Sequence, residues 1–135
     1  MKIYVASSWR NVYQPAVVRR FREAGHEVYD FRNANGFQWS EIDGNWQDWI
    51  PEQYIEALDH PLAVNGYHTD FDAMEWADMC VLVMPCGRSA HLEAGYFIGA
   101  KKPMYILMLD KNEPELMYKL ATGIYTNIDE LLAGV

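Results

Sequence analysis

The stretch CVLVMPCGRSAHLEAGY at residues 80–96 decides the fold of this chain. It begins with an unbroken apolar run, Cys80–Met84, which is typical of a strand that is covered on both faces of a sheet. Pro85 and Gly87 end this strand. Ser89 is a good residue to cap a following helix, because its hydroxyl can accept a hydrogen bond from a backbone N–H one turn in. The stretch therefore predicts a strand, a tight loop and a helix.

The predicted helix carries a glutamate, Glu93, in its first turn or just after it. A carboxylate at that place lies near the positive end of the helix dipole, which favours its ionised form by roughly 0.3–1 kcal/mol. Glu93 then has two interpretations. It complements the dipole or completes a cap, or it is an anion aimed at the ends of the strands. The rest of the chain is needed to decide between them.

The composition indicates one globular domain over residues 1–135 that binds small molecules. Of the 135 residues, 50% are apolar and 14% aromatic, so the chain can bury a core and disorder is excluded. The net charge of −8 argues against polyanionic partners, so we expect neither nucleic acid nor an anionic membrane surface to bind. The sequence has no apolar run of about 18 residues or more, which predicts that no segment spans a membrane.

The two cysteines point to a reducing compartment. Cys80 in the core strand and Cys86 in the following loop fit neither a disulfide framework nor a zinc spacing. We therefore expect reduced thiols in a cytoplasmic protein. No spacing of His, Cys or Asp predicts a metal site, and the Gly-rich fingerprints of dinucleotide and P-loop sites do not occur, so no cofactor is expected.

Strand-like and helix-like segments alternate along the chain. Strands are expected at 2–6, 26–31, 80–84, 102–109 and 124–126. Beyond the helix of the opening stretch, helices are expected from Pro15 to about Gly25 and at 51–58, 67–77, 113–121 and 128–132. This alternation predicts a three-layer α/β domain with a doubly wound, flavodoxin-like parallel sheet of five strands in the order 2-1-3-4-5.

In that order the ligand crevice lies between the carboxyl ends of the first and third strands, where the order reverses. The two loops that meet there are rich in hydroxyl groups and arginines. One carries Ser7, Ser8, Trp9 and Arg10, and the other carries Gly87, Arg88 and Ser89, with Glu93 behind it. Two helix N-termini converge on the same place, so the crevice suits an anion or a sugar.

The region from Arg32 to Gly66 interrupts the alternation. The run at 33–40 has turn residues with embedded aromatic rings, and Trp46, Trp49 and Tyr54 follow it. Two interpretations stay open for these rings. They form a lid or a pocket wall, or they form a satellite core under a surface excursion.

Four local patterns occur in a telling order. They are Ile3–Trp9, Asp70 placed eight residues before Asp78, Leu92–Tyr96 and Pro114–Met117. Together they resemble the nucleoside 2-deoxyribosyltransferase superfamily, whose members exchange bases on deoxyribose or hydrolyse the N-glycosidic bond of nucleoside 5′-monophosphates. The resemblance extends from Lys2 to about Gly123 and is loose from Arg32 to Gly66.

The resemblance implies a role for individual residues and a partner. Tyr4 would orient the nucleophile, Trp9 would pack against the base, Asp70 would be the catalytic aspartate and Glu93 the nucleophile. Met117 lies in a segment that a neighbouring subunit contributes to the sugar site in the family. The resemblance therefore implies self-association as a dimer or larger assembly, with a small-molecule nucleoside or nucleotide as substrate.

Two possibilities remain for the 5′ end of the substrate, a free hydroxyl or a phosphate. Four residues look like the phosphate-binding loop of the monophosphate hydrolases: Ser8, Arg10, Arg88 and Ser89. Trp9 favours the transferases instead, and Glu115 would lie badly near a phosphate. Gly87 stands where some transferases carry an acidic residue, so one contact to a sugar hydroxyl is missing.

The implied chemistry is a double displacement at the anomeric carbon. Breaking an N-glycosidic bond develops positive charge at C1′, which a carboxylate below that carbon stabilises and can trap as a covalent glycosyl intermediate. Glu93 would take that role, Asp70 would protonate the departing base, and Tyr4 would fix the rotamer of Glu93. Two alternatives stay open: an NAD glycohydrolase of similar fold, which needs no second carboxyl group, and a nucleotide sensor without turnover.

Overall fold

The computed structural model describes residues 1–33 and 36–135, which form two compact units. The first unit comprises Met1–Asp30 and Trp76–Val135, and the second comprises Phe31–Glu75. The turn-rich run expected at 33–40 includes residues 34 and 35, which lie outside the described residues.

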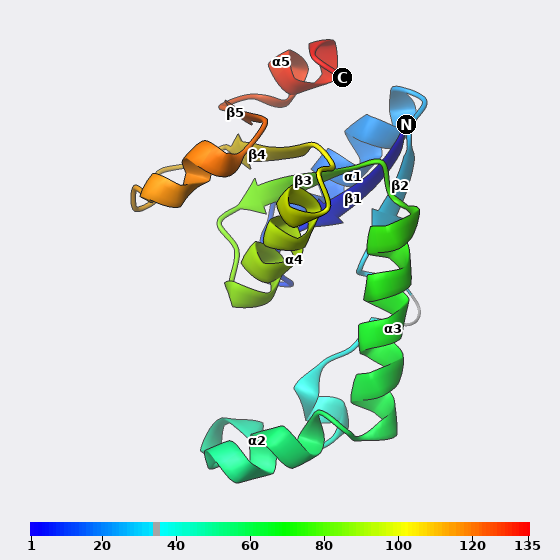
Figure 1. Ribbon diagram of the computed structural model, residues 1–135, viewed down its shortest axis with the longest axis vertical. Coiled ribbons are helices and arrows are strands. Elements are labelled where there is room, and N and C mark those ends of the chain that lie inside the picture. The colour runs from blue at the N-terminus through cyan, green and yellow to red at the C-terminus, as the bar shows by residue number, and fades with distance from the viewer. Residues whose placement is uncertain (34–35) are drawn as a thin grey trace. The chain divides into compact units, whose positions relative to one another are not determined.

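A parallel sheet of five strands lies at the centre of the first unit (Figure 1). The strands are β1 (Lys2–Ala6), β2 (Glu27–Asp30), β3 (Met79–Met84), β4 (Met104–Met108) and β5 (Gly123–Tyr125). Their order is β2-β1-β3-β4-β5, and every neighbouring pair is parallel. The predicted order and the doubly wound, flavodoxin-like fold are therefore confirmed.

Helices cover both faces of this sheet, as expected for a three-layer fold (Figure 1). Alternate strand residues such as Ile3 and Val81 point to one face, where α1 (Gln14–Glu23) and α5 (Ile128–Ala133) contribute Phe21 and Leu131 to the core. The intervening residues point to the opposite face because successive side chains of a strand alternate. There α4 (Arg88–Gly99) packs against β1, β3 and β4. This second face includes Tyr4 of β1.

The register of the central strands sets the carboxyl edge of the sheet. β1 and β3 pair from Ile3 opposite Met79 to Ala6 opposite Leu82. β3 then continues to Met84 alongside β4, where Met84 pairs with Met108. The two loops that leave β1 and β3 therefore start at neighbouring strand ends, and no further β1–β3 pairing holds them together.

Two local predictions need correction. Ser89 does not cap α4: the capping residue is Gly87, in extended conformation, and Ser89 is the second residue of the helix. Gly87 and Ser89 are both residue types that favour the start of a helix, and α4 starts after Gly87. The helix expected at 113–121 is only a short 3₁₀ helix, η3 (Leu116–Leu120). Pro114 disfavours a helical conformation at Glu113, and Glu115 is extended, so η3 begins only at Leu116.

The second unit contains α2 (Pro51–Ala57), α3 (Pro61–Trp76, which ends in the first unit) and two short 3₁₀ helices, η1 (Trp39–Glu41) and η2 (Trp46–Asp48). Its aromatic rings pack edge to face. The ring centroid of Trp39 lies 5.0 Å from that of Phe37, 5.8 Å from that of Trp49 and 5.9 Å from that of Tyr54. The rings thus contact one another in one cluster, in which Phe37, Trp39 and Trp49 are partly buried and Tyr54 is exposed. The choice between a pocket wall and a satellite core stays a prediction. No helix among the described residues is long and apolar enough to cross a bilayer.

Candidate active site

The candidate site is centred on a hydrogen bond between Tyr4 of β1 and Glu93 of α4. The hydroxyl of Tyr4 donates to the Oε2 atom of Glu93, which joins residues that are 89 positions apart. Strand alternation directs Tyr4 to the face of the sheet on which α4 packs. Because β1 and β3 are the strands at which the order reverses, this pair lies where a doubly wound sheet places its ligand crevice.

The ring of Tyr4 is held on two sides, which fixes the direction of its hydroxyl. It stacks on Tyr29 of β2 at 5.2 Å between centroids and contacts Phe97 of α4 at 5.6 Å. Only 1% of Tyr4 is exposed. The hydroxyl is therefore a buried donor on a rigid support, whereas Glu93 is only partly buried and its carboxylate can meet solvent or a ligand.

Glu93 is the sixth residue of α4, which begins at Arg88, so it lies in the second turn and not in the first. The helix dipole acts mainly within the first turn, and its contribution at Glu93 is small. The interpretation of Glu93 as a residue that completes a cap is excluded, because it lies beyond the cap. The hydrogen bond from Tyr4 orients the carboxylate.

The charge of Glu93 reaches the nearby thiols. Burial, and secondly the negative charge of Glu93, raise the pKa of Cys86 to about 12. The same two causes raise the pKa of Cys80, which is fully buried in β3. Both cysteines therefore carry protonated thiols at neutral pH, and neither is activated as a nucleophile.

In the loop after β1, some of the predicted site residues make hydrogen bonds to the backbone and others are exposed to solvent. The hydroxyl of Ser7 donates to the backbone carbonyl of Val83 at 2.9 Å, so Ser7 holds the loop to β3. The hydroxyl of Ser8 accepts a hydrogen bond from the backbone N–H of Arg10 at 3.1 Å. Trp9 is 43% exposed and Arg10 is also exposed, so these two side chains can meet a ligand.

The loop after β3 presents the start of α4. Gly87 makes no side-chain cap, and its backbone carbonyl accepts from the backbone N–H of His91 at 3.4 Å. Arg88 and Ser89 are exposed. The cap position of this helix thus supplies no side-chain acceptor to the first N–H groups. The guanidinium group of Arg88 belongs to the same turn, and such an arrangement favours an anion.

Asn11 is a residue of this site that our reasoning from the sequence missed. Its side chain is almost completely buried, with 3% exposed, and it hydrogen-bonds to backbone groups of both loops. Asparagine is a strong cap residue, and its place shortly before Pro15 could have indicated the start of α1. Its bonds to the loop after β3 had no signal in the sequence.

Gln14 is a second buried polar residue that we missed. Its Nε2 atom donates to Asp30, at the end of β2, at 2.8 Å. Gln14 is entirely buried, and its Oε1 atom has no hydrogen-bond partner. Asp30 is thus held at the end of β2, directly after Tyr29 and opposite Val5 of β1.

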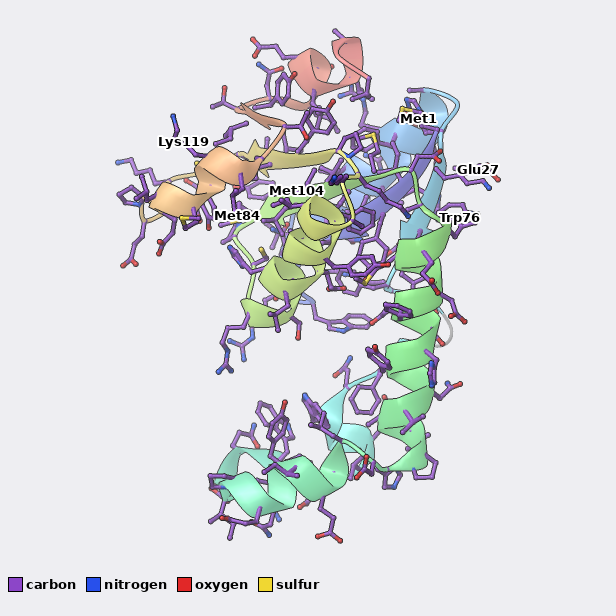
Figure 2. All side chains as sticks on the ribbon, viewed as in Figure 1. Met1, Glu27, Trp76, Met84, Met104 and Lys119 are labelled. Atoms are coloured by element: carbon purple, nitrogen blue, oxygen red, sulfur yellow. The ribbon has the colours of Figure 1, made fainter. Side chains whose placement is uncertain are left out.

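A cavity lies on the other flank of α4. It measures about 520 Å³, and α4 contributes His91, Ala94, Gly95 and Ile98 to its wall, but not Glu93. Met84 of β3 and Met104 of β4 also line it (Figure 2). Since helix residues three and four apart share a face, this cavity is separate from the Tyr4–Glu93 pair.

Met117 belongs to this separate cavity in its own chain. It lies on η3, is 63% exposed and lines the cavity together with Glu115 and Tyr118. Tyr118 is fixed to α4, because its hydroxyl lies 2.8 Å from Nε2 of His91 and the two rings stack. The structure therefore places Met117 away from the Tyr4–Glu93 pair of the same chain, and its part in a neighbouring site stays a prediction.

Asp70 lies on α3 in the second compact unit, where it is partly buried, and the neighbouring Asp72 is exposed. Its pairing with Glu93 stays a prediction. Among residues 1–33 and 36–135, no three or more His, Cys, Asp or Glu side chains form a group that could hold a metal ion.

Fold and site together define a class: a doubly wound α/β chain with a tyrosine–glutamate pair at the point where the strand order reverses. No protein-family model matches the chain, and no curated protein matches it. Solved structures do match it in fold.

A 2-deoxyribosyltransferase from the psychrotolerant bacterium Bacillus psychrosaccharolyticus has a TM-score of 0.69 and 17% identity, over 98% of this chain and 90% of that chain. The CMP N-glycosidase BcmB of Clostridium botulinum has a TM-score of 0.55 and 17% identity, over 99% of this chain and 97% of that chain. A conserved protein from Enterococcus faecalis V583 has a TM-score of 0.61 and 13% identity, over 98% and 95% of the two chains. The resemblance that the sequence suggested therefore extends to the fold.

Proposed function

We propose that this protein cleaves or transfers the N-glycosidic bond of a nucleoside or deoxynucleoside, with Glu93 as the nucleophile. The observation that carries the proposal is the hydrogen bond from Tyr4 of β1 to Glu93 of α4, the helix that follows β3. Two proteins of the same fold, a 2-deoxyribosyltransferase and a CMP N-glycosidase, carry names that imply reactions at such a bond.

The proposed reaction runs in two displacements. In the first, a carboxylate oxygen of Glu93 forms a bond to C1′ while the bond from C1′ to the base nitrogen breaks, and Asp70 supplies a proton to the departing base. In the second, an acceptor base or water attacks C1′ and releases Glu93, and Asp70 takes up the proton of the attacking group. Tyr4 keeps one carboxylate oxygen oriented, so that the other one faces the sugar.

The cysteines do not offer a competing nucleophile. Cys86 is the thiol closest to the loop after β3, and a thiol whose pKa is raised to about 12 is protonated at neutral pH. This supports a mechanism through a glycosyl ester of Glu93.

A second candidate, hydrolysis of a nucleoside 5′-monophosphate, has its own supporting observation. The start of α4 has no side-chain cap. Arg88, the first residue of α4, and Arg10, in the loop after β1, are both exposed. A phosphate would gain hydrogen bonds from the first N–H groups of the helix and from a guanidinium. Ser8 and Ser89 would complete this subsite.

Self-association is part of the proposal. The 3₁₀ helix η3 exposes three large apolar side chains: Leu116 at 78%, Met117 at 63% and Leu120 at 53%. Apolar groups that gather in this way are commonly covered by a partner. In the proposed assembly, Met117 of one copy completes the sugar site of its neighbour.

One set of incubations tests the function. Deoxynucleosides, ribonucleosides and their 5′-monophosphates are each supplied with and without a free acceptor base, and products are separated by liquid chromatography. Release of base without an acceptor indicates a hydrolase, and exchange of bases indicates a transferase. Binding without any product would refute the enzymatic proposal and favour a sensor.

The variant Asp70→Asn separates the proposal from an NAD glycohydrolase of similar fold. Loss of the proton donor should slow release of a poor leaving base by about 10²-fold or more. Turnover that is undiminished in this variant, together with cleavage of NAD, would contradict the assignment of Asp70.

A further inference from the structure

No backbone hydrogen bonds of the sheet join the loop after β1 to the loop after β3, which together carry the proposed substrate-binding residues. Pairing of β1 and β3 ends at Ala6 opposite Leu82. Beyond this point the loop with Ser8 and Arg10 and the loop with Arg88 and Ser89 are connected by side chains. Their relative position decides whether groups from both loops can reach one ligand.

The side chain of Asn11 connects the loops. Its Nδ2 atom donates to the backbone carbonyls of Val83 at 3.3 Å and Pro85 at 2.9 Å. Its Oδ1 atom accepts from the backbone N–H groups of Tyr13 at 2.8 Å and Gln14 at 2.9 Å. These four bonds use both protons of the amide and both lone pairs of its oxygen.

Each half of this amide has a separate task. The oxygen binds N–H groups at the start of α1, as a cap residue does, and thereby fixes the loop after β1. The nitrogen binds two carbonyls of the chain that leaves β3. Ser7 also donates to Val83, but Asn11 is the donor to Pro85, two residues closer to Gly87 and the start of α4.

We propose that Asn11 is a positioning residue for the proposed reaction, which sets the loop after β1 against the loop after β3 and so assembles the substrate site from both. This inference rests on the proposed function. The four hydrogen bonds of the buried Asn11 side chain go to backbone groups of the two loops and the start of α1. Asn11 therefore acts on how substrate is held, while the orientation of the nucleophile depends on Tyr4.

The variant Asn11→Asp tests the nitrogen and keeps the oxygen. Aspartate retains an acceptor for the start of α1, where its charge also suits the helix dipole. It replaces the donor by an oxygen that faces the carbonyls of Val83 and Pro85. Asn127 offers a matched control, because its side chain caps α5 by accepting from the N–H of Glu130 at 2.9 Å, away from both loops. The control variant is Asn127→Asp.

The thiol of Cys86 reports on the loop without any need for activity. It lies next to Pro85, and burial raises its pKa to about 12, so it reacts slowly with a disulfide reagent such as DTNB. We expect about tenfold faster modification of Cys86 in Asn11→Asp than in Asn127→Asp, since two hydrogen bonds that close the loop are lost. The variant Cys86→Ser identifies the reacting thiol.

The kinetic expectation is a rise in KM of about tenfold in Asn11→Asp, with kcat within about threefold of the wild type, measured well below the unfolding temperature. A purely structural role would lower stability and leave KM of the folded enzyme unchanged. If Asn11→Asp does not fold, Asn11→Ser keeps a small cap oxygen without the charge and is measured in the same way.

The outcomes distinguish a failure of the role assigned to Asn11 from a failure of the proposed function. Unchanged reactivity of Cys86 would overturn the connection between the loops, and faster modification with unchanged KM would overturn the positioning role. A wild-type protein without turnover on any nucleoside or nucleotide would overturn the proposed function and with it this catalytic role, whereas the thiol measurement would still report on the connection.

Discussion

The variant Tyr4→Phe removes the one hydroxyl that orients the proposed nucleophile and leaves the rest of the side chain in place. The contacts of the ring with Tyr29 and Phe97 depend on its faces and edge, so the substitution leaves them intact. What is lost is a hydrogen bond to a carboxylate. Bonds to charged groups contribute about 1.5–3 kcal/mol.

The expected kinetic effect follows from this range. Each 1.36 kcal/mol corresponds to a factor of ten in rate, so the full loss would lower kcat/KM by about 10- to 150-fold. Because Glu93 is partly exposed, water can replace part of the lost bond, and we expect the lower part of the range, about 10- to 30-fold. The free energy of unfolding should fall by only about 1 kcal/mol.

The assay is the initial rate of base release, followed by liquid chromatography, with unfolding in urea as a parallel measurement. Tyr105→Phe is the matched control, since Tyr105 packs on the opposite face of the sheet with the cluster of Ile3 and Val81. It should change kcat/KM less than twofold. A Tyr4→Phe enzyme that turns over at the rate of the wild type would refute the idea that this hydrogen bond orients the nucleophile.

Three further predictions concern other residues. Glu93→Gln should lower turnover by about three orders of magnitude or more while the fold is kept, and no glycosyl adduct should appear by mass spectrometry; an active variant would exclude Glu93 as nucleophile. Gly66→Ala should lower the free energy of unfolding by about 1–3 kcal/mol in urea, because the added Cβ would lie 2.7 Å from Cβ of Phe37, and unchanged stability would contradict this packing. Because the pKa of Cys86 is raised in the folded state, the buried thiol contributes stability that is fully present below the pKa of the unfolded thiol and is lost as pH rises toward about 12. Cys86→Ser should therefore lose about 2 kcal/mol less stability than the wild type between pH 8.5 and 10.5; equal losses would argue against a buried thiol.

The sequence was informative wherever a pattern repeats over many residues. The apolar run around Val81 and the alternation of strands and helices predicted the sheet and its order, because a strand buried on both faces needs apolar residues throughout. The same order predicted that the loop with Ser7 to Arg10 lies opposite the start of the helix that carries Glu93, since the carboxyl ends of parallel strands share one edge. The pairing of Tyr4 with Glu93 was expected only from the family resemblance.

The sequence was less informative where neighbouring residues compete or where a bond is long-range. Gly87 and Ser89 both suit a helix start, and local preference does not decide between them, so the cap was assigned to the wrong residue. Asn11 donates hydrogen bonds to backbone carbonyls 72 and 74 positions away. Every residue has a backbone carbonyl, so the residue types at those positions do not indicate such a bond. The cluster of Trp39 with Phe37, Trp49 and Tyr54 similarly depends on ring contacts that a short sequence pattern does not predict.

The two outermost strands of the sheet are its shortest, with four residues in β2 and three in β5. An exposed strand edge is a template on which another chain can continue the hydrogen bonds of the sheet, and a short edge strand offers few backbone groups for such bonds. We therefore expect concentrated solutions of this protein to resist fibril growth from the sheet margins. Copies that meet should do so through side chains on their helical surfaces.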